Sequence, residues 1–325
     1  MFYFLQKHRW LQVVVIVVAM AYFCVRLFST PLILTHYDDF LPCAEWLSAS
    51  IVQWQSLYRA LILLAVISEG VLLINFFHKS NMLEQKSFFP IIWFVGFMVV
   101  GCYSQPLTPV FITNLIILCL VNLNKDYQNE RVKTQVLLSG GLIGVASFFD
   151  FTAVLLLFYV VIALAINRFS KLKDMIVTLL GFLIPYIYMF SYHFFVDDVA
   201  VYAASFQQFH LNFPLLKILS FSLWKIAALA VFILLIPFVL VRLKMLFDNK
   251  LVIIRQRYIT LNFLFLTLVV MMFLSNIPFP YTMGYLFVPL SFYFTAIISD
   301  KRISFIKEVV LFVLVAAVVV LGLPI

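Results

Sequence analysis

Long runs of apolar residues recur along the whole chain and are separated by short segments that contain most of its charges. A helix needs about 20 mostly apolar residues to cross a bilayer, with a range of about 17–25. On this template the pattern predicts about eleven spans, and we expect an all-α integral membrane protein with one polytopic domain over residues 1–325. The predicted spans are Leu11–Leu27, Tyr58–Phe77, Phe88–Tyr103, Thr108–Leu123, Gln135–Phe149, Phe151–Ile166, Met175–Phe195, Leu219–Val241, Tyr258–Ser275, Thr282–Ser299 and Ile303–Leu323.

The overall composition agrees with a membrane protein. Apolar residue types make up 65% of the 325 residues and charged types 11%, whereas soluble domains contain about 45–50% apolar and about 25% charged residues. A water-soluble protein is therefore excluded. Gly, Pro and Cys are too scarce for a collagen-like chain or for a small domain held together by disulfides.

The basic residues divide unevenly between the two sets of connecting segments. If the N-terminus is cytoplasmic, all of the 22 Lys and Arg residues except Arg26, Arg59, Lys217 and Lys225 lie in or beside the inner segments. Lys and Arg resist translocation, so we expect a multi-pass protein of the bacterial inner membrane with a cytoplasmic N-terminus. The net charge of +8 then reflects topology and contact with anionic membrane lipid, and gives no indication of nucleic-acid binding.

Two outer segments, 28–57 and 196–218, are longer than a simple connection requires. Each carries aromatic residues at a spacing of three or four, such as Trp46 and Trp54 in the first segment and Phe206 and Phe209 in the second. Trp and Tyr are favoured at the headgroup level of a bilayer. We therefore expect both segments to form helices that lie flat at the outer membrane surface.

The first outer segment contains the run Thr35-His36-Tyr37-Asp38-Asp39. A carboxylate there could act as a general base towards an acceptor hydroxyl, or bind a divalent cation that neutralises a phosphate leaving group. Carboxylate oxygens favour Mg²⁺ or Mn²⁺ as that cation. The alternative is that Asp38 and Asp39 are solvated caps near a helix start.

Four further residues are candidates for substrate binding, and each has a plainer interpretation. Asp150 lies where two short spans turn back, so it could sit below the surface or be a simple turn residue. Glu69 falls near the middle of the second span, where we expect a protonated, paired or cavity-facing acid. His210 could approach the acidic pair or be an interface residue, and Arg59 could bind a lipid-linked phosphate or extend to lipid headgroups.

One stretch of the chain carries a recognisable combination of features between Pro106 and Tyr186. It contains Asn114, a basic inner loop, the run Leu-Ser-Gly-Gly-Leu-Ile-Gly-Val-Ala-Ser at 138–147, and then Gly181 with Pro185. The Gly140 and Gly144 pair in this run predicts close packing of two helices. The stretch resembles the helical hairpin region of GT-C type glycosyltransferases, membrane enzymes that use polyprenyl-phosphate-linked sugars. The whole chain also resembles a polytopic membrane-protein family of Bacteroidota.

The GT-C resemblance implies an essential acid in the first outer loop, the position of Asp38 and Asp39. One hypothesis is therefore a transferase that moves a sugar from a polyprenyl phosphate to an envelope acceptor. In it, Asp38 or Asp39 is the base or metal ligand, Asp150 contacts the substrate or supports a residue that does, and Arg59 contacts the phosphate. Two other functions remain open on the sequence. One is a non-catalytic scaffold or accessory subunit with an envelope protein partner, and the other is a transporter or lipid flippase that depends on Glu69.

Overall fold

The computed structural model is helical throughout the part of the chain that it describes. These residues are 8–29, 54–80, 82, 88–101, 107–124, 132–167, 172–197, 199–200, 223–248, 250–275, 277, 279–299, 313 and 316. They form α2 (Arg9–Ser29), α4 (Gln55–Ser80), α5 (Phe89–Gly101), α6 (Leu107–Leu123), α7 (Val132–Ser147), η1 (Phe151–Leu155), α8 (Leu156–Ile166), α9 (Leu172–Phe195), α12 (Leu223–Phe247), α13 (Val252–Leu274) and α14 (Phe279–Ser299).

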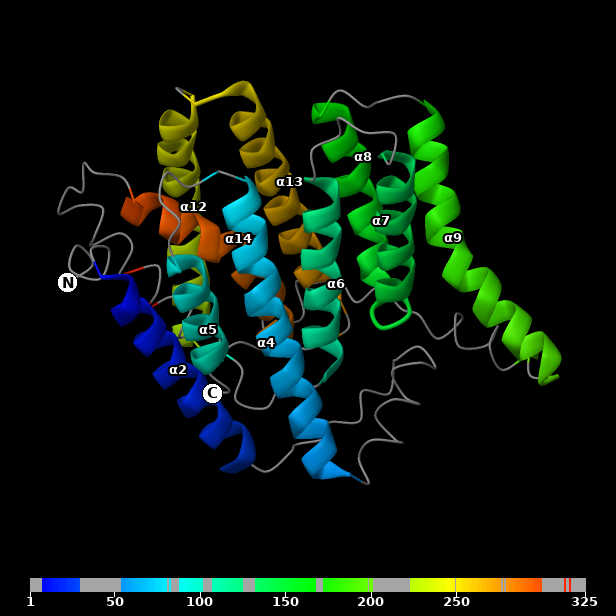
Figure 1. Ribbon diagram of the computed structural model, residues 1–325, viewed down its shortest axis with the longest axis horizontal. Helices are drawn as coiled ribbons and strands as arrows, with labels where there is room; N and C mark the ends of the chain where they lie inside the picture. Colours follow the sequence, from blue (N-terminus) through cyan, green and yellow to red (C-terminus); the bar gives the residue numbers. More distant parts are fainter. Residues whose placement is uncertain are drawn as a thin grey trace.

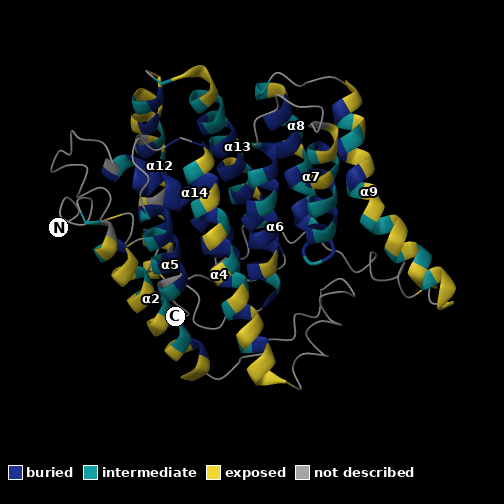
Figure 2. Cartoon of the chain, viewed as in Figure 1, coloured by how far each residue is buried: buried dark blue, intermediate teal, exposed yellow. Residues whose placement is uncertain are grey.

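The helices form a bundle in which successive elements run in opposite directions (Figure 1). Helices α4, α6 and α7 stand next to one another, with α2 and α5 at one edge and α9 at the other. The C-terminal half of α9 leans away from the bundle, and its side chains there are mostly exposed (Figure 2). Helix α14 crosses the bundle obliquely instead of running parallel to its neighbours.

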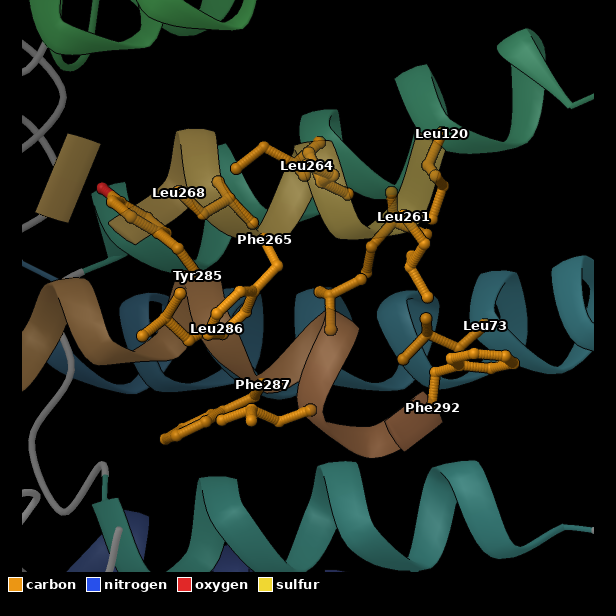
Figure 3. Packing of buried hydrophobic residues seen from close by; sticks show 14 of the residues in the cluster. Leu73, Leu120, Leu261, Leu264, Phe265, Leu268, Tyr285, Leu286, Phe287 and Phe292 are labelled. Carbon is orange, nitrogen blue, oxygen red and sulfur yellow. The ribbon is translucent and has the colours of Figure 1, made fainter. Parts of the chain in front are cut away.

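Helix α14 forms the centre of the hydrophobic core. Within Tyr281–Ile298, 89% of the residues are buried. Phe292 stacks on Phe77 of α4 with ring centroids 5.4 Å apart, and Phe287 stacks on Phe97 of α5 at 5.4 Å. Figure 3 shows Leu261, Leu264, Phe265 and Leu268 of α13 facing these α14 side chains, with Leu73 of α4 beside Phe292. Helix α14 therefore packs against several other helices at once.

The glycines of α7 and α9 bring the two helix backbones into direct contact. A Cβ atom added at Gly140 would overlap the carbonyl oxygen of Thr178, and one at Gly181 would overlap the carbonyl oxygen of Leu137. Small residues permit this approach, which strengthens van der Waals packing where the hydrophobic effect gives little drive for association. The close packing predicted from Gly140 and Gly144 is confirmed.

The predicted spans agree with the described helices in position but less well in length. Every predicted span up to Thr282–Ser299 overlaps a helix, whereas most of Ile303–Leu323 and of the two outer segments lies outside the described residues. Among the described residues, five helices are long and apolar enough to cross a membrane, namely Trp10–Ser29, Gln55–Ser80, Leu172–Phe195, Val252–Leu274 and Tyr281–Ile298. The chain is thus an all-α, multi-pass membrane protein. The 13 residues of α5 rise only about 20 Å, less than a hydrocarbon core of about 30 Å, so eleven crossings remain a prediction.

The described cations gather at one end of the bundle. Lys79, Lys133, Lys173, Lys244 and Arg255 belong to helix ends at the top of Figure 1. Arg26 and Arg59 belong to the lower ends of α2 and α4. This segregation is the pattern that the positive-inside rule requires of a membrane protein with its upper end in the cytoplasm. The orientation itself stays a prediction.

Substitution of the interfacial glycines should separate α7 from α9. We expect Gly140→Ala and Gly181→Ala each to lower the free energy of unfolding by about 1–3 kcal/mol, the usual cost of overpacking, measured by thermal unfolding of the detergent-purified chain. Gly96→Ala is the matched control, since a Cβ atom at Gly96 meets nothing within 4 Å. Equal melting temperatures for the three variants would contradict the close packing.

Candidate functional site

The structure describes half of the residues that the sequence singles out. Arg59, Glu69 and Asp150 are described, whereas Asp38, Asp39 and His210 lie outside the described residues. Arg59 and Asp150 belong to helix ends at the lower side of Figure 1, and Glu69 lies within the length of α4. Hydrogen bonds place Arg59 at the α2–α4 junction and Asp150 at a separate junction between α7 and α13.

Asp150 begins the short helix η1 after the turn that ends α7. Its backbone is extended, with φ −147° and ψ 110°, and its Oδ1 atom accepts hydrogen bonds from the Thr152 backbone N–H at 3.0 Å and the Thr152 Oγ1 hydroxyl at 2.6 Å. This is the arrangement of an N-cap, in which a side-chain oxygen satisfies a backbone donor at the start of a helix. The positive end of the helix dipole also favours a carboxylate at this position.

The second oxygen of Asp150 links this turn to a distant part of the chain. Ser275, which follows α13, donates its Oγ hydroxyl to Asp150 Oδ2 at 2.6 Å and accepts a hydrogen bond from the Ile277 backbone N–H at 3.1 Å. The start of η1 is therefore tied to the connection between α13 and α14. Asp150 is only 7% exposed, so these bonds form away from bulk water and are correspondingly strong.

The Tyr285 hydroxyl of α14 lies close enough to the Asp150 carboxylate for the two groups to interact electrostatically. Tyr285 is 0% exposed, and its hydroxyl has no hydrogen-bond partner among the described residues. Figure 3 shows its ring reaching from α14 towards Leu268 of α13. A hydroxyl without a hydrogen-bond partner among the described residues thus lies buried where α14 packs on α13.

The three bonds to Asp150 determine what this residue can do. A carboxylate that accepts hydrogen bonds from three protein donors is held in one orientation. It is well suited to fix the geometry of the turn and less suited to accept a proton from a substrate. We therefore interpret Asp150 as a positioning residue, and a direct substrate contact stays a prediction.

Arg59 joins the ends of α2 and α4. Its guanidinium Nη1 donates a hydrogen bond to the Phe28 carbonyl at 2.8 Å and lies over the Phe28 ring, 5.8 Å from the centroid. This bond satisfies one of the carbonyls that a helix leaves unpaired at its C-terminus. The segment that contains Asp38 and Asp39 leaves the described chain at Ser29 and returns at Trp54. Arg59 therefore contacts the end of α2 from the first turns of α4.

Glu69 is buried in α4 without a polar contact. It is 0% exposed, and neither carboxyl oxygen has a hydrogen-bond partner among the described residues. The neighbouring polar groups bond to each other instead, since Ser68 donates to Asn114 Oδ1 at 2.7 Å and Asn114 Nδ2 donates to the Ala65 carbonyl at 3.1 Å. The sequence predicts a protonated, paired or cavity-facing acid here, and no partner for it lies within the described part of the chain. Burial of a polar group without a hydrogen bond is costly.

Sequence reasoning did not identify Ser275 or Tyr285. Ser275 is followed by Asn276, Ile277 and Pro278, a helix-stop signal that predicts the end of α13 but not its partner 125 residues away. Tyr285 lies in an apolar run where nothing distinguishes it from a core aromatic residue. Ser275 reaches Asp150 from the end of α13, and Tyr285 is buried in α14, so only the three-dimensional arrangement of the helices identifies them.

Comparisons with known proteins add no further assignment. No protein-family model, no curated protein and no solved structure matches the chain. The resemblances to GT-C transferases and to the Bacteroidota family stay predictions. Within the described ranges no group of three or more His, Cys, Asp and Glu side chains could hold a metal ion, and the predicted ligands Asp38 and Asp39 lie outside those ranges.

The link between Asp150 and Ser275 can be measured with a double-mutant cycle. We expect Asp150→Ala and Ser275→Ala each to destabilise the chain, with a coupling free energy of about 1–3 kcal/mol because the residues share a buried charge-assisted bond. Thermal unfolding in detergent provides the values. Ser191→Ala is the control partner, because Ser191 bonds only to its own helix at the Ile187 carbonyl. Fully additive effects of Asp150→Ala and Ser275→Ala would exclude the link.

Proposed function

We propose that the protein is a GT-C-like membrane glycosyltransferase, which moves a sugar from a polyprenyl-phosphate donor to an envelope acceptor on the outer side of the bacterial inner membrane. The observation that supports this most is the position of Arg59. Its guanidinium bonds to the Phe28 carbonyl, one residue before the described part of α2 ends at Ser29. Asp38 and Asp39 follow α2 in the sequence, and the proposal assumes that they lie near this cation.

The charge distribution favours this end for an anionic donor. Most described cations belong to the opposite end, and Arg59 and Arg26 are the described guanidinium groups of the lower ends of α2 and α4. Arg26 donates its Nε–H to the Tyr22 hydroxyl at 2.9 Å. Arg binds phosphate through two parallel N–H bonds, which combines charge with directional recognition.

The proposed reaction assigns a role to each candidate. Asp38 or Asp39 accepts the proton of the acceptor hydroxyl while that oxygen attacks the anomeric carbon of the sugar. The bond from this carbon to the phosphate oxygen breaks, and the polyprenyl phosphate leaves with its negative charge next to Arg59. A Mg²⁺ or Mn²⁺ ion held by the same acids would neutralise that charge. His210 contributes a contact from the second outer segment, and Asp150 holds the nearby turn in place.

A second candidate function is a carrier of protons, solute or lipid. The specific observation that favours it is Glu69, a fully buried acid of the 26-residue α4 that has no hydrogen-bond partner among the described residues. Ionisable groups within membrane helices are costly, and they commonly belong to proton relays or substrate pathways. In this alternative Glu69 takes up and releases a proton as the bundle changes conformation.

The transferase proposal predicts that the acidic pair is essential. Membranes containing the full chain are incubated with polyprenyl-phosphate-linked radiolabelled mannose or glucose, and the loss of label from the donor is measured. We expect Asp38→Asn/Asp39→Asn to reduce turnover at least about 100-fold, the usual contribution of a general base. Arg59→Lys should mainly raise the KM for donor, because the single ammonium loses bidentate phosphate binding.

Asp197→Asn is the matched control for this experiment. Asp197 is an exposed acid after α9 with a positive φ of 60°, a conformation that Asn adopts readily, so the variant should fold and retain full activity. Undiminished turnover in the Asp38→Asn/Asp39→Asn variant would refute the transferase proposal.

The carrier alternative predicts opposite effects of one substitution on stability and transport. Glu69→Leu should raise the free energy of unfolding by about 1–3 kcal/mol, since it removes an unsatisfied buried polar group. It should also abolish proton flux or lipid movement, followed in proteoliposomes with a pH-sensitive dye and with a fluorescent phospholipid. Ser68→Ala, one residue away, is the control and should retain transport. A stabilised Glu69→Leu variant with unchanged flux would leave Glu69 without a transport role.

A further inference from the structure

A groove separates α12 from α13 at the end of the bundle where the cations gather. Its volume is about 280 Å³. Side chains from both helices line it at helical spacing, so that one face of α12 opposes one face of α13. The lining residues are Leu240, Val241, Lys244, Phe247, Asp248, Arg255, Tyr258, Ile259 and Asn262.

The floor of the groove is rigid and apolar. Phe247 and Tyr258 stack with ring centroids 4.6 Å apart and an interplanar angle of 12°, and both are buried. The Tyr258 hydroxyl donates a hydrogen bond to the Leu240 carbonyl at 3.2 Å, which ties α13 to α12. Tyr293 of α14 donates to Asn262 Oδ1 at 2.7 Å. The groove is therefore formed before any ligand enters.

Part of the groove lining is exposed apolar surface. Val241 is 54% exposed, and Met245 and Val252 beside the groove are also exposed apolar residues. An acyl chain could thus enter sideways from the bilayer without crossing a polar barrier. A small soluble anion would gain nothing from such an apolar floor and side entrance, so the shape favours a lipid.

The lining of the groove contains two cations, Lys244 from α12 and Arg255 from α13. They differ from the nearby Arg257, whose guanidinium donates to the Ser80 carbonyl at 2.6 Å and to the Asn124 carbonyl at 3.3 Å. Arg257 thus caps the ends of α4 and α6, whereas Lys244 and Arg255 line an open space. Asp248 is the acid in the lining, so the cations outnumber it and the groove carries a net positive charge.

We propose that this groove binds one anionic phospholipid of the leaflet at this end of the bundle. The phosphate lies between Lys244 and Arg255, and one acyl chain follows Leu240, Val241 and Ile259 over the aromatic floor. Basic pockets between membrane helices bind acidic lipid headgroups through this combination of charge and apolar surface. The site is independent of the proposed transferase chemistry, which belongs to the opposite end of the bundle.

The test compares lipids of different headgroup charge on the full chain in detergent. Dioleoyl phosphatidylglycerol, dioleoyl phosphatidylcholine and inorganic phosphate are each titrated, with binding followed by native mass spectrometry and by the shift in melting temperature. We expect phosphatidylglycerol to bind and stabilise the protein, and the other two to have little effect. Equal binding of the two lipids would overturn the proposal, and so would a phosphate ion that competes with phosphatidylglycerol at similar concentration.

Variants then separate the two parts of the site. Lys244→Gln/Arg255→Gln should weaken phosphatidylglycerol binding about 30-fold, because each basic residue near an anionic headgroup contributes about fivefold. Asp248→Asn should strengthen binding, since it removes the acid from the rim. Val241→Trp leaves the charges intact and should block the acyl chain.

Lys133→Gln/Lys173→Gln is the matched control, because both are exposed cations of the same end of the bundle on α7 and α9. It should bind phosphatidylglycerol as the unmodified chain does. An equal loss of binding in this control would mean that the lipid senses only the overall charge of this end, and would overturn the assignment to the groove. Full binding by Val241→Trp would overturn the path of the acyl chain.

Discussion

The absence of water from the bilayer core constrains every polar group in this bundle. Hydroxyl side chains meet the constraint by bonding back to their own helix, as Thr113 does to the Pro109 carbonyl and Thr295 to the Ser291 carbonyl. Such bonds satisfy the hydroxyl but do not join one helix to another. Other polar groups do join helices, as Ser68 of α4 bonds to Asn114 of α6 and Tyr293 of α14 bonds to Asn262 of α13. Shape adds to these bonds, through glycine contacts between α7 and α9 and aromatic packing around α14.

The two acids that the structure buries most clearly meet this constraint in different ways. Asp150 has three donors and links segments far apart in the chain, so its charge contributes to a defined arrangement of helix ends. Glu69 has no partner among the described residues, and its burial is unfavourable for folding. Costly buried groups are often found where their chemistry serves a function. Asp150 therefore stabilises the fold, whereas Glu69 opposes it.

Sequence patterns predicted local features better than the arrangement of helices. Runs of apolar residues predicted the positions of the helices because each buried helix needs such a run in its own sequence. The spacing of Gly140 and Gly144 predicted a close contact because small residues at this spacing let two helices approach each other. Nothing local indicated that α14 would be central, since its apolar content resembles that of helices at the edge. The Asp150–Ser275 bond also escaped detection, because a pairing across 125 residues leaves no periodic signal. In the sequence, Lys244 and Arg255 indicate only the orientation of the chain in the membrane. In the structure, α12 and α13 bring them to the lining of one groove.

The central position of α14 has a consequence for biosynthesis. This helix follows every other described helix against which it packs, and chains are synthesised from the N-terminus. While the ribosome is still producing α13, the faces of α4, α5 and α6 that will meet α14 have no partner. The nascent bundle must remain open, with these faces covered by lipid or by the insertion machinery, until Phe279–Ser299 arrives. Among the described helices, assembly therefore ends with a late insertion into the middle of the bundle, and not with successive addition of helices at its edge.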